Sequence, residues 1–222
     1  MSKSEDAVTV EPPETADASV IWLHGLGADG HDFEAIVPHL GDQVRRHVRF
    51  IFPHAPEIPV TINNGYVMRA WYDVLNMDIA RRADANGVRA SEQILTGYIE
   101  AEQARGIASN RIIVAGFSQG GALALHTGLR YTLPLAGILA LSCYLPLAET
   151  TADEAHAANA SVPLFMAHGN HDPIIPIAAG EQARDLVESL GYAVEWHSYP
   201  VEHAVCLEEI EDVASWLSRL LD

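Results

Sequence analysis

Short apolar runs alternate along this chain with longer segments of helical periodicity, and this alternation limits the fold more than any other feature. Apolar residues recur at helical spacing over 33–40, 91–103, 122–129, 177–190 and 207–221. Between these segments, six runs have the length and apolar content of buried strands, namely 19–23, 48–52, 111–115, 136–142, 162–167 and 194–199. Such an alternation is typical of a mostly parallel sheet with helices on both faces. The sequence therefore predicts an α/β fold.

The amino-terminal end and one long connection have a different composition. Residues 1–18 hold five acidic residues and two prolines, with neither the cationic start nor the apolar run of a secretory signal, and we expect a mobile acidic arm. The length of 222 residues suits one sizeable core, so residues 19–222 are predicted to form a single α/β domain. Residues 53–77, with prolines and an Asn-Asn-Gly turn, are predicted to form an irregular excursion with a small hairpin.

The charge balance restricts the partners. Thirteen Lys and Arg against thirty Asp and Glu give a formal net charge of -17, which repels nucleic-acid phosphates and anionic membrane surfaces. No stretch approaches the ~20 consecutive apolar residues that cross a bilayer, so no stable membrane insertion is expected. The two cysteines, Cys143 and Cys206, are expected to be small buried hydrophobic residues. A chain of this size with only two cysteines is not a disulfide scaffold, so a cytoplasmic location is expected. Apolar residues of the 53–77 excursion suggest a homodimer.

A glycine-rich turn between a strand and a helix carries the first candidate catalytic residue. Residues 111–129 read RIIVAGFSQGGALALHTGL, which contains the pattern G-x-S-x-G with Ser118 at its centre. Such a turn brings two backbones close, which glycine permits, and leaves the serine hydroxyl at the positive end of the helix. A phosphate-binding turn is the alternative, but no G-x-G-x-x-G or GK[ST] pattern is present. Ser118 is therefore predicted to be a nucleophile.

A serine nucleophile needs a base and a carboxylate that orients the base. Asp172 follows the run at 162–167 and His203 follows the run at 194–199, so both are expected at the carboxyl edge of the sheet with Ser118. His168 and His171 beside Asp172 raise the alternative of a metal site. No HExxH pattern or carboxylate set accompanies them, so no metal is expected.

The segment HGLG, His24 to Gly27, follows the first of the six apolar runs. In a site of this kind, a backbone N–H from such a loop and another from the residue after the nucleophile bind the developing oxyanion. We therefore assign Leu26 and Gln119 as oxyanion donors through their amides. His24 is expected to brace the loop and not to exchange protons.

Five motifs together resemble one known family. HGLGADGHDF, GFSQGGALAL, SCYLP, HGNHDPIIP and EHAV are similar to bacterial carboxylesterases of the phospholipase/carboxylesterase family, relatives of acyl-protein thioesterases, over nearly the whole chain from Ser19. The resemblance implies the α/β hydrolase fold without a large lid and hydrolysis of carboxylic esters or thioesters without metal or cofactor. It also implies the triad Ser118, Asp172 and His203 with Leu26 and Gln119 as oxyanion donors.

The expected function is that of a serine carboxylesterase acting on small-molecule or lipid-like esters and thioesters with short to medium acyl chains, through an acyl-enzyme. Acyl-protein thioesterase or lysophospholipase as main activity is the alternative, followed by a transferase or perhydrolase and by a binding protein without chemistry. Where the family often has glycine, this chain has Cys143, so the pocket wall is expected to differ there. The acyl pocket is predicted to include Trp71, Tyr72, Leu75, Leu145 and Ile175.

Overall fold

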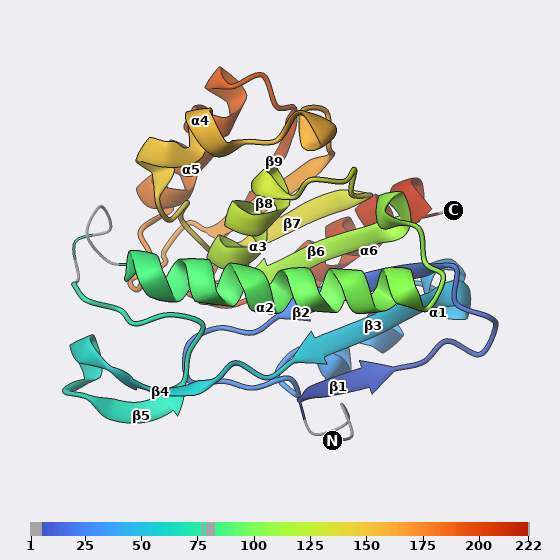
Figure 1. The fold of residues 1–222 in the computed structure, drawn as a ribbon, viewed down its shortest axis with the longest axis horizontal. Helices are drawn as coiled ribbons and strands as arrows, with labels where there is room; N and C mark the ends of the chain where they lie inside the picture. The colour runs from blue at the N-terminus through green and yellow to red at the C-terminus, as the bar shows by residue number, and fades with distance from the viewer. Residues whose placement is uncertain (1–5, 77, 79–82, 222) are drawn as a thin grey trace.

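A seven-stranded sheet forms the centre of the protein, which we describe from a computed structural model over residues 6–76, 78 and 83–221 (Figure 1). The spatial order of its strands is β1-β3-β2-β6-β7-β8-β9. β1 runs antiparallel to β3, and each other neighbouring pair is parallel, which confirms the predicted α/β sheet. The strands are β1 (Ala7–Val10), β2 (Ala18–Leu23), β3 (Val48–Pro53), β6 (Ile112–Phe117), β7 (Gly137–Leu141), β8 (Leu164–Gly169) and β9 (Val194–Tyr199).

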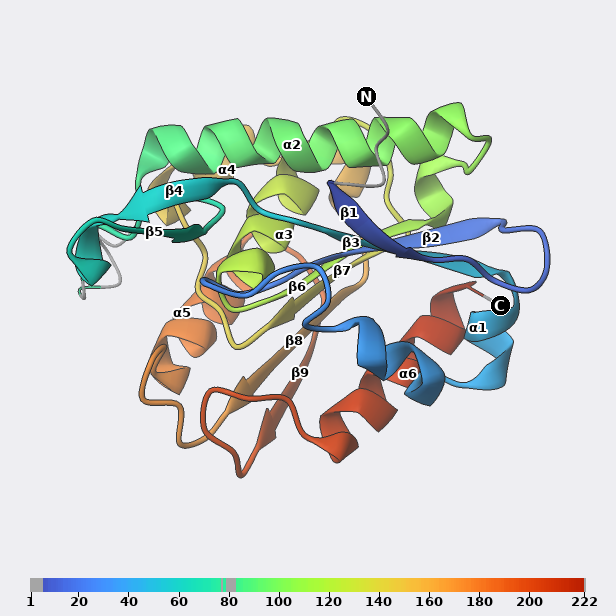
Figure 2. The ribbon, with the colours of Figure 1, turned by 90° about the horizontal axis from the view of Figure 1, so that it is seen from below.

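Helices cover both faces of this sheet, with α2, α3 and α5 on one side and α1 and α6 on the other (Figure 2). Within the described part of the chain, no helix combines the length and the apolar character needed to cross a bilayer. The helices are α1 (Asp42–His47), α2 (Ala85–Ala104), α3 (Gln119–Arg130), α4 (Thr151–Glu154), α5 (Ile177–Ser189) and α6 (Leu207–Leu221), with short 3-10 segments at η2 (Glu34–His39), η3 (Thr61–Asn63), η5 (Ser109–Arg111), η6 (Ala148–Thr150) and η7 (Ala157–Asn159).

The side chains of the central strands divide between two hydrophobic cores, because successive residues of a strand point to opposite faces. In β2, Ile21 and Leu23 pack on the side of α2, α3 and α5, whereas Val20 and Trp22 pack on the side of α1 and α6. All residues of β2 are buried. Burial on both faces explains why these strands appear in the sequence as continuous apolar runs.

From residue 6 onward, the amino-terminal segment differs from the mobile arm expected over residues 1–18, of which residues 1–5 lie outside the described part of the chain. Residues 7–10 form β1 and pair with β3 at the edge of the sheet. Further along, the Asp17 carboxylate forms an ion pair of 2.8 Å with Arg111. The acidic composition suggested solvation, but the short alternating strand and the ion pair attach this segment to the sheet.

The start of α2 also differs from the prediction, which placed helical residues only over 91–103. The helix begins at Ala85, and the carboxylate of Asp84 caps it by accepting hydrogen bonds from the amides of Asn86 (3.2 Å) and Gly87 (3.0 Å). Ser91 lies inside the helix, where its hydroxyl donates to the carbonyl of Trp71. The pair Asn86-Gly87 is typical of a loop turn, so the sequence does not indicate that the helix has already begun at these residues.

The predicted hairpin within residues 53–77 is confirmed. β4 (Glu57–Val60) and β5 (Tyr66–Arg69) pair antiparallel as a separate two-stranded sheet. Asn64 and Gly65, with φ of 56° and 75°, turn the chain between them. Figure 1 shows the hairpin projecting beyond the end of α2 nearest to β4.

Glu209 is a buried carboxyl group in the first turn of α6, with 1% of its surface exposed. Burial is the main reason that its pKa rises to about 8, and the nearby Asp212 carboxylate acts in the same direction. The folded protein therefore holds this carboxyl group protonated at neutral pH.

Replacing Glu209 by Gln should make stability less dependent on pH. The folded carboxyl keeps its proton up to about pH 8, whereas the unfolded one loses it near 4.5, so folding becomes less favourable as the pH rises between these values. Between pH 5 and 8 the wild type should lose up to about 4 kcal/mol of unfolding free energy relative to Glu209→Gln. Urea unfolding of both proteins measures this difference, and a difference that stays constant with pH would contradict the prediction.

Candidate active site

Ser118 is the single residue between the end of β6 and the start of α3. Its φ of 55° and ψ of -120° lie in a region that residues other than glycine rarely adopt. The Ser118 amide donates to the carbonyl of Leu141 in β7 (2.8 Å), and its carbonyl accepts from the amide of Ala122 (2.9 Å). These two bonds hold the strained residue at the carboxyl edge of the sheet.

Two glycines allow α3 to approach the sheet at this turn. A Cβ atom on Gly116 would lie 2.3 Å from the carbonyl carbon of Gly120, and one on Gly120 would lie 2.3 Å from the carbonyl oxygen of Leu23. Both distances are far below van der Waals contact. The mechanical role predicted for the glycines of the G-x-S-x-G pattern is therefore confirmed.

The structure brings Ser118, Asp172 and His203 together from the ends of three strands. Nδ1 of His203 lies 2.6 Å from Oδ2 of Asp172, and Nε2 lies 2.9 Å from Oγ of Ser118. Because Nδ1 donates its hydrogen to the carboxylate, Nε2 is left to accept the hydrogen of the serine hydroxyl. The three side chains form one chain of hydrogen bonds.

Asp172 is itself fixed by the backbone that follows it. Its Oδ1 accepts hydrogen bonds from the amides of Ile174 (2.8 Å) and Ile175 (2.9 Å), and its side chain is fully buried. The ring of His203 packs 4.7 Å from the ring of Phe117, measured between centroids. The carboxylate and the imidazole are therefore restricted to one orientation before any substrate arrives.

The other two histidines near Asp172 lie in different surroundings. His168 is buried, and its Nε2 donates to the carbonyl of Ile175 over 2.8 Å. Burial lowers the pKa of His168, so its ring is neutral. His171 is exposed. Among the described residues, no group of three or more His, Cys, Asp or Glu side chains is arranged to hold a metal ion.

His24 braces the loop that precedes the site, as the sequence predicts. Its Nδ1 donates to the carbonyl of Gly25 (2.7 Å), and its Nε2 accepts from the amide of Ala55 (3.0 Å). Burial lowers the pKa of His24 to about 4, which keeps the ring neutral. The His24 carbonyl also accepts from the indole Nε1 of Trp71 (2.9 Å), so the loop is tied to the segment after β5.

Leu26 and Gln119, the predicted oxyanion donors, both line the pocket that contains Ser118. Gln119 is the first residue of α3, where amides have no partner within the helix and carry the positive end of the helix dipole. Its side chain accepts from the amide of Trp71 (2.8 Å) and donates to the carbonyl of Tyr72 (2.7 Å). The side chain therefore fixes the pocket wall, while the amide is placed beside Ser118.

The pocket around Ser118 has a volume of about 220 Å³ and contains two of the five predicted acyl-pocket residues, Tyr72 and Ile175. The other three do not line it: Trp71 is buried, Leu75 is 48% exposed, and Leu145 lines a neighbouring pocket. Further residues of the lining were not predicted from the sequence. These are Gly25, Ala28, Asp32, Val74, Phe117, Tyr144 and Ile174.

Tyr144 belongs to two pockets. It lines the pocket of Ser118, and it also lines a larger one of about 490 Å³ whose walls include residues 145–149 and parts of α5. Its hydroxyl lies 3.0 Å from the hydroxyl of Tyr72. Tyr144 is part of the SCYLP motif, which was the sequence signal that pointed to this wall.

Cys143 precedes Tyr144 but does not line either pocket. Its thiol is buried and free, and burial raises its pKa to about 12. Cys206 is also free and half-buried. The prediction of a small hydrophobic residue holds for Cys143, which remains a neutral thiol.

Comparisons with known proteins agree with this geometry. The family model for phospholipase/carboxylesterase matches residues 4–221. Acyl-protein thioesterase 1 of Neurospora crassa is 40% identical and covers 92% of this chain and 87% of its own, and that of Gibberella zeae is 38% identical and covers 92% and 91%.

Solved plant structures are similar as well. Arabidopsis thaliana SOBER1 has 30% identity and a TM-score of 0.88, with 92% of this chain and 99% of that chain covered. Zea mays acyl-protein thioesterase 2 has 28% identity and a TM-score of 0.87, with 97% and 99% covered. These relatives are fungal and plant proteins, so they leave the bacterial subgroup suggested by the motifs without support. The matches over almost its full length show that this chain belongs to the phospholipase/carboxylesterase family of α/β hydrolases.

Proposed function

We propose that this protein is a serine hydrolase whose main reaction is the hydrolysis of acyl thioesters, in particular those on acylated proteins. The observation that carries the proposal is the hydrogen-bonded chain from Ser118 through His203 to Asp172 beside a largely apolar pocket. The fungal relatives bear the name acyl-protein thioesterase, which favours this alternative over a general carboxylesterase of short to medium acyl chains. Oxyester hydrolysis is the second candidate, because the same groups attack either carbonyl.

In the proposed reaction, Oγ of Ser118 attacks the acyl carbonyl while its proton passes to Nε2 of His203. Asp172 stabilises the imidazolium, and the amides of Leu26 and Gln119 bind the oxyanion. The imidazolium then protonates the departing thiolate, and an acyl-enzyme forms on Ser118. Water, giving its proton to His203, attacks this ester, and the carboxylic acid leaves as the proton returns to Ser118.

The apolar side of the pocket suits the acyl chain. Tyr72, Val74, Tyr144 and Ile175 present mainly hydrocarbon next to Ser118, and the larger pocket beyond Tyr144 adds apolar walls. Burial of each methylene from water is worth about 0.8 kcal/mol, so these walls would select for longer chains. The two pockets support an acyl substrate in preference to a polar one.

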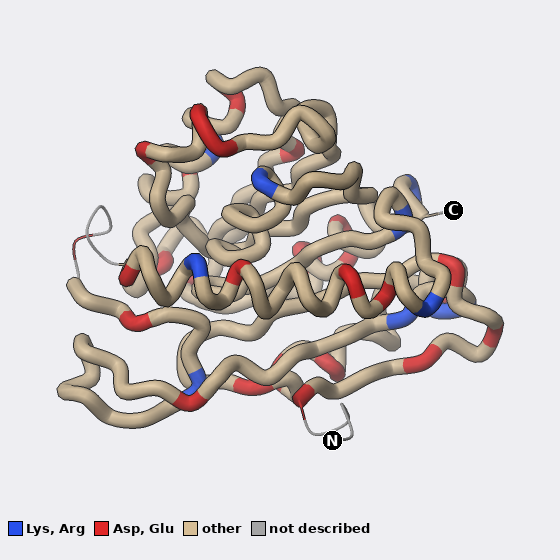
Figure 3. The backbone as a smooth tube through the Cα atoms, in the orientation of Figure 1, with Lys and Arg blue, Asp and Glu red and all other residues tan. Residues whose placement is uncertain are grey.

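The pocket lining includes one carboxylate, Asp32, on the loop that also supplies Leu26, and we assign this side of the pocket to the leaving group. Burial, and then the Asp29 carboxylate, raise the pKa of Asp32 above its ordinary value. Acidic positions outnumber basic ones along the described backbone (Figure 3), and the formal net charge of the chain is -17. We expect leaving groups with a positive charge to be favoured.

A cytoplasmic location and a homodimer stay predictions from the sequence. The exposed large apolar side chains within the described part of the 53–77 excursion are Tyr66, Val67 and Leu75, and they would supply the dimer surface.

Ser118→Ala should lose the attacking oxygen and with it both turnover and covalent labelling by a fluorophosphonate. A fall in kcat of about 10⁴-fold or more is expected, measured on a chromogenic thioester. The matched control is Ser215→Ala, an exposed serine on α6, which should label and turn over like the wild type. Labelling that persists in Ser118→Ala would exclude Ser118 as nucleophile.

A pair of peptides tests the substrate class. One carries an acyl chain on a cysteine sulfur, and the other carries the same chain on a serine oxygen at the same position. We expect kcat/KM to be at least about tenfold higher for the thioester, beyond the difference in their hydroxide-catalysed rates. Faster cleavage of the oxyester would favour the carboxylesterase function instead.

Asp32→Asn should weaken a preference for cationic leaving groups. Butyrylthiocholine and the butyryl thioester of mercaptopropanesulfonate share the acyl chain but differ in leaving-group charge. The ratio of their kcat/KM values should fall by about three- to tenfold in the variant. Asp42→Asn removes the same charge from an exposed side chain on α1 and should leave the ratio unchanged. Equal ratios in all three proteins would refute this role of Asp32.

A further inference from the structure

The chain between β7 and η6, residues 142–147, forms a wall shared by two pockets. Tyr144 lines both pockets, and residues 145–147 line the larger one. The segment contains no helix or strand, and Ser142 and Leu147 have φ of 47° and 51°. Residues other than glycine keep such angles only where their surroundings hold them. The shape of the wall therefore depends on contacts from outside the segment.

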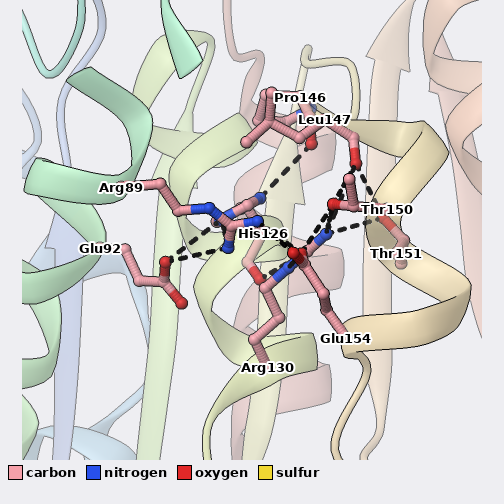
Figure 4. Close-up of polar contacts among 9 residues, drawn as sticks. All are labelled: Arg89, Glu92, His126, Arg130, Pro146, Leu147, Thr150, Thr151 and Glu154. Atoms are coloured by element: carbon pink, nitrogen blue, oxygen red, sulfur yellow. Dashed lines mark hydrogen bonds and ion pairs between the residues drawn. The ribbon is translucent and has the colours of Figure 1, made fainter. Parts of the chain in front are cut away.

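Arg130, the last residue of α3, supplies several of these contacts (Figure 4). Its Nη2 donates to the carbonyl of Leu147 (3.5 Å) and to the hydroxyls of Thr150 and Thr151 (3.1 Å each). Its Nε donates to the carboxylate of Glu154 (2.7 Å). The Arg130 side chain is 4% exposed, so bulk water does not compete for these bonds.

Glu154 in α4 joins this arginine to a second one. Nη2 of Arg89 in α2 donates to both of its carboxylate oxygens, at 2.5 and 2.6 Å. The Arg89 guanidinium is the first of the groups that lower the pKa of Glu154 to about 2, so the carboxylate stays ionised at any physiological pH. We call Arg89, Arg130 and Glu154 the arginine clamp.

His126 adds another contact from α3 to the same wall. Its ring is fully buried, and its Nδ1 lies 3.4 Å from the carbonyl of Pro146. On its other side, Nε2 lies 3.5 Å from the carboxylate of Glu92 and 3.4 Å from Nη1 of Arg89 (Figure 4). The wall is thus attached to α3 at two consecutive carbonyls, those of Pro146 and Leu147.

The attachment matters because α3 begins directly after Ser118 and ends at Arg130. A helix is a rigid spacer, so contacts at its far end fix the wall relative to the nucleophile. We propose that the arginine clamp is a set of positioning residues: it holds the 142–147 wall against α3 and thereby keeps the larger pocket open to acyl chains that extend past Tyr144. This inference rests on the proposed function.

A purely structural role makes a different prediction. Loss of a buried ion pair that only stabilises the fold would lower activity equally on all substrates or not at all. Loss of a positioning contact would instead affect the substrates whose acyl chain reaches the larger pocket. The dependence of kcat/KM on acyl length separates the two roles.

The experiment compares wild type, Arg130→Met and Glu154→Gln on a butyryl and a palmitoyl thioester of the same soluble thiol. We expect kcat/KM on the butyryl thioester to stay within about twofold, and that on the palmitoyl thioester to fall by about tenfold or more, mainly through KM. Arg130→Lys keeps the positive charge at position 130 and should restore part of the loss. Inactivation rates with butyl and dodecyl fluorophosphonates give the same comparison without turnover.

The matched control is Arg111→Met, which removes an arginine that also bonds to a carboxylate, Asp17 (2.8 Å), and to a backbone carbonyl, Leu221 (2.7 Å), but lies outside both pockets. It should lower thermal stability without changing the ratio between the two chain lengths. An unchanged ratio in folded Arg130→Met and Glu154→Gln, or equal losses on both substrates, would overturn the proposal. Failure of the proposed function would appear separately, as the absence of wild-type turnover on both thioesters or as full activity in Ser118→Ala.

Discussion

The close approach of α3 to the sheet is the constraint on which the site depends. Ser118 occupies its strained turn only because Gly116 and Gly120 leave no Cβ atoms between the helix and strands β6 and β2. Any side chain at either position would displace the helix and with it the hydroxyl, the first amides of α3 and the clamp at its far end. Two glycines thus determine the positions of groups that lie along the full length of a helix.

The parallel sheet supplies the remaining geometry. Because β6, β8 and β9 run in the same direction, the loops that follow them meet at one edge, and this edge receives Ser118, Asp172 and His203. The direction of the strands alone therefore brings residues that are far apart in the sequence close together in space. The loop after β2 reaches the same edge, which places Leu26 in the pocket.

Much of this arrangement could be predicted from the sequence. Strands buried on both faces appear as continuous apolar runs, and a serine in a turn between a strand and a helix appears as the G-x-S-x-G pattern. β1 was not predicted, because its four residues lie in an acidic segment and form a strand only by pairing with β3. The pocket wall was predicted only in part: Tyr72 and Ile175 were found, whereas Tyr144 and Asp32 were not. Its members come from five separate loops and from the turn between β6 and α3, and their meeting depends on long-range packing that no local pattern encodes.

Gln119 combines a proposed role of its backbone amide, that of an oxyanion donor, with an observed role of its side chain. Its backbone amide lies at the start of α3, and its side chain satisfies the buried amide of Trp71 and the buried carbonyl of Tyr72. Each of those groups would cost about 1 to 3 kcal/mol if left without a partner. A shorter residue at this position would keep the backbone amide but lose both side-chain hydrogen bonds to the loop at residues 71–72. One substitution at position 119 would therefore disturb the pocket wall while leaving the amide beside Ser118 in place.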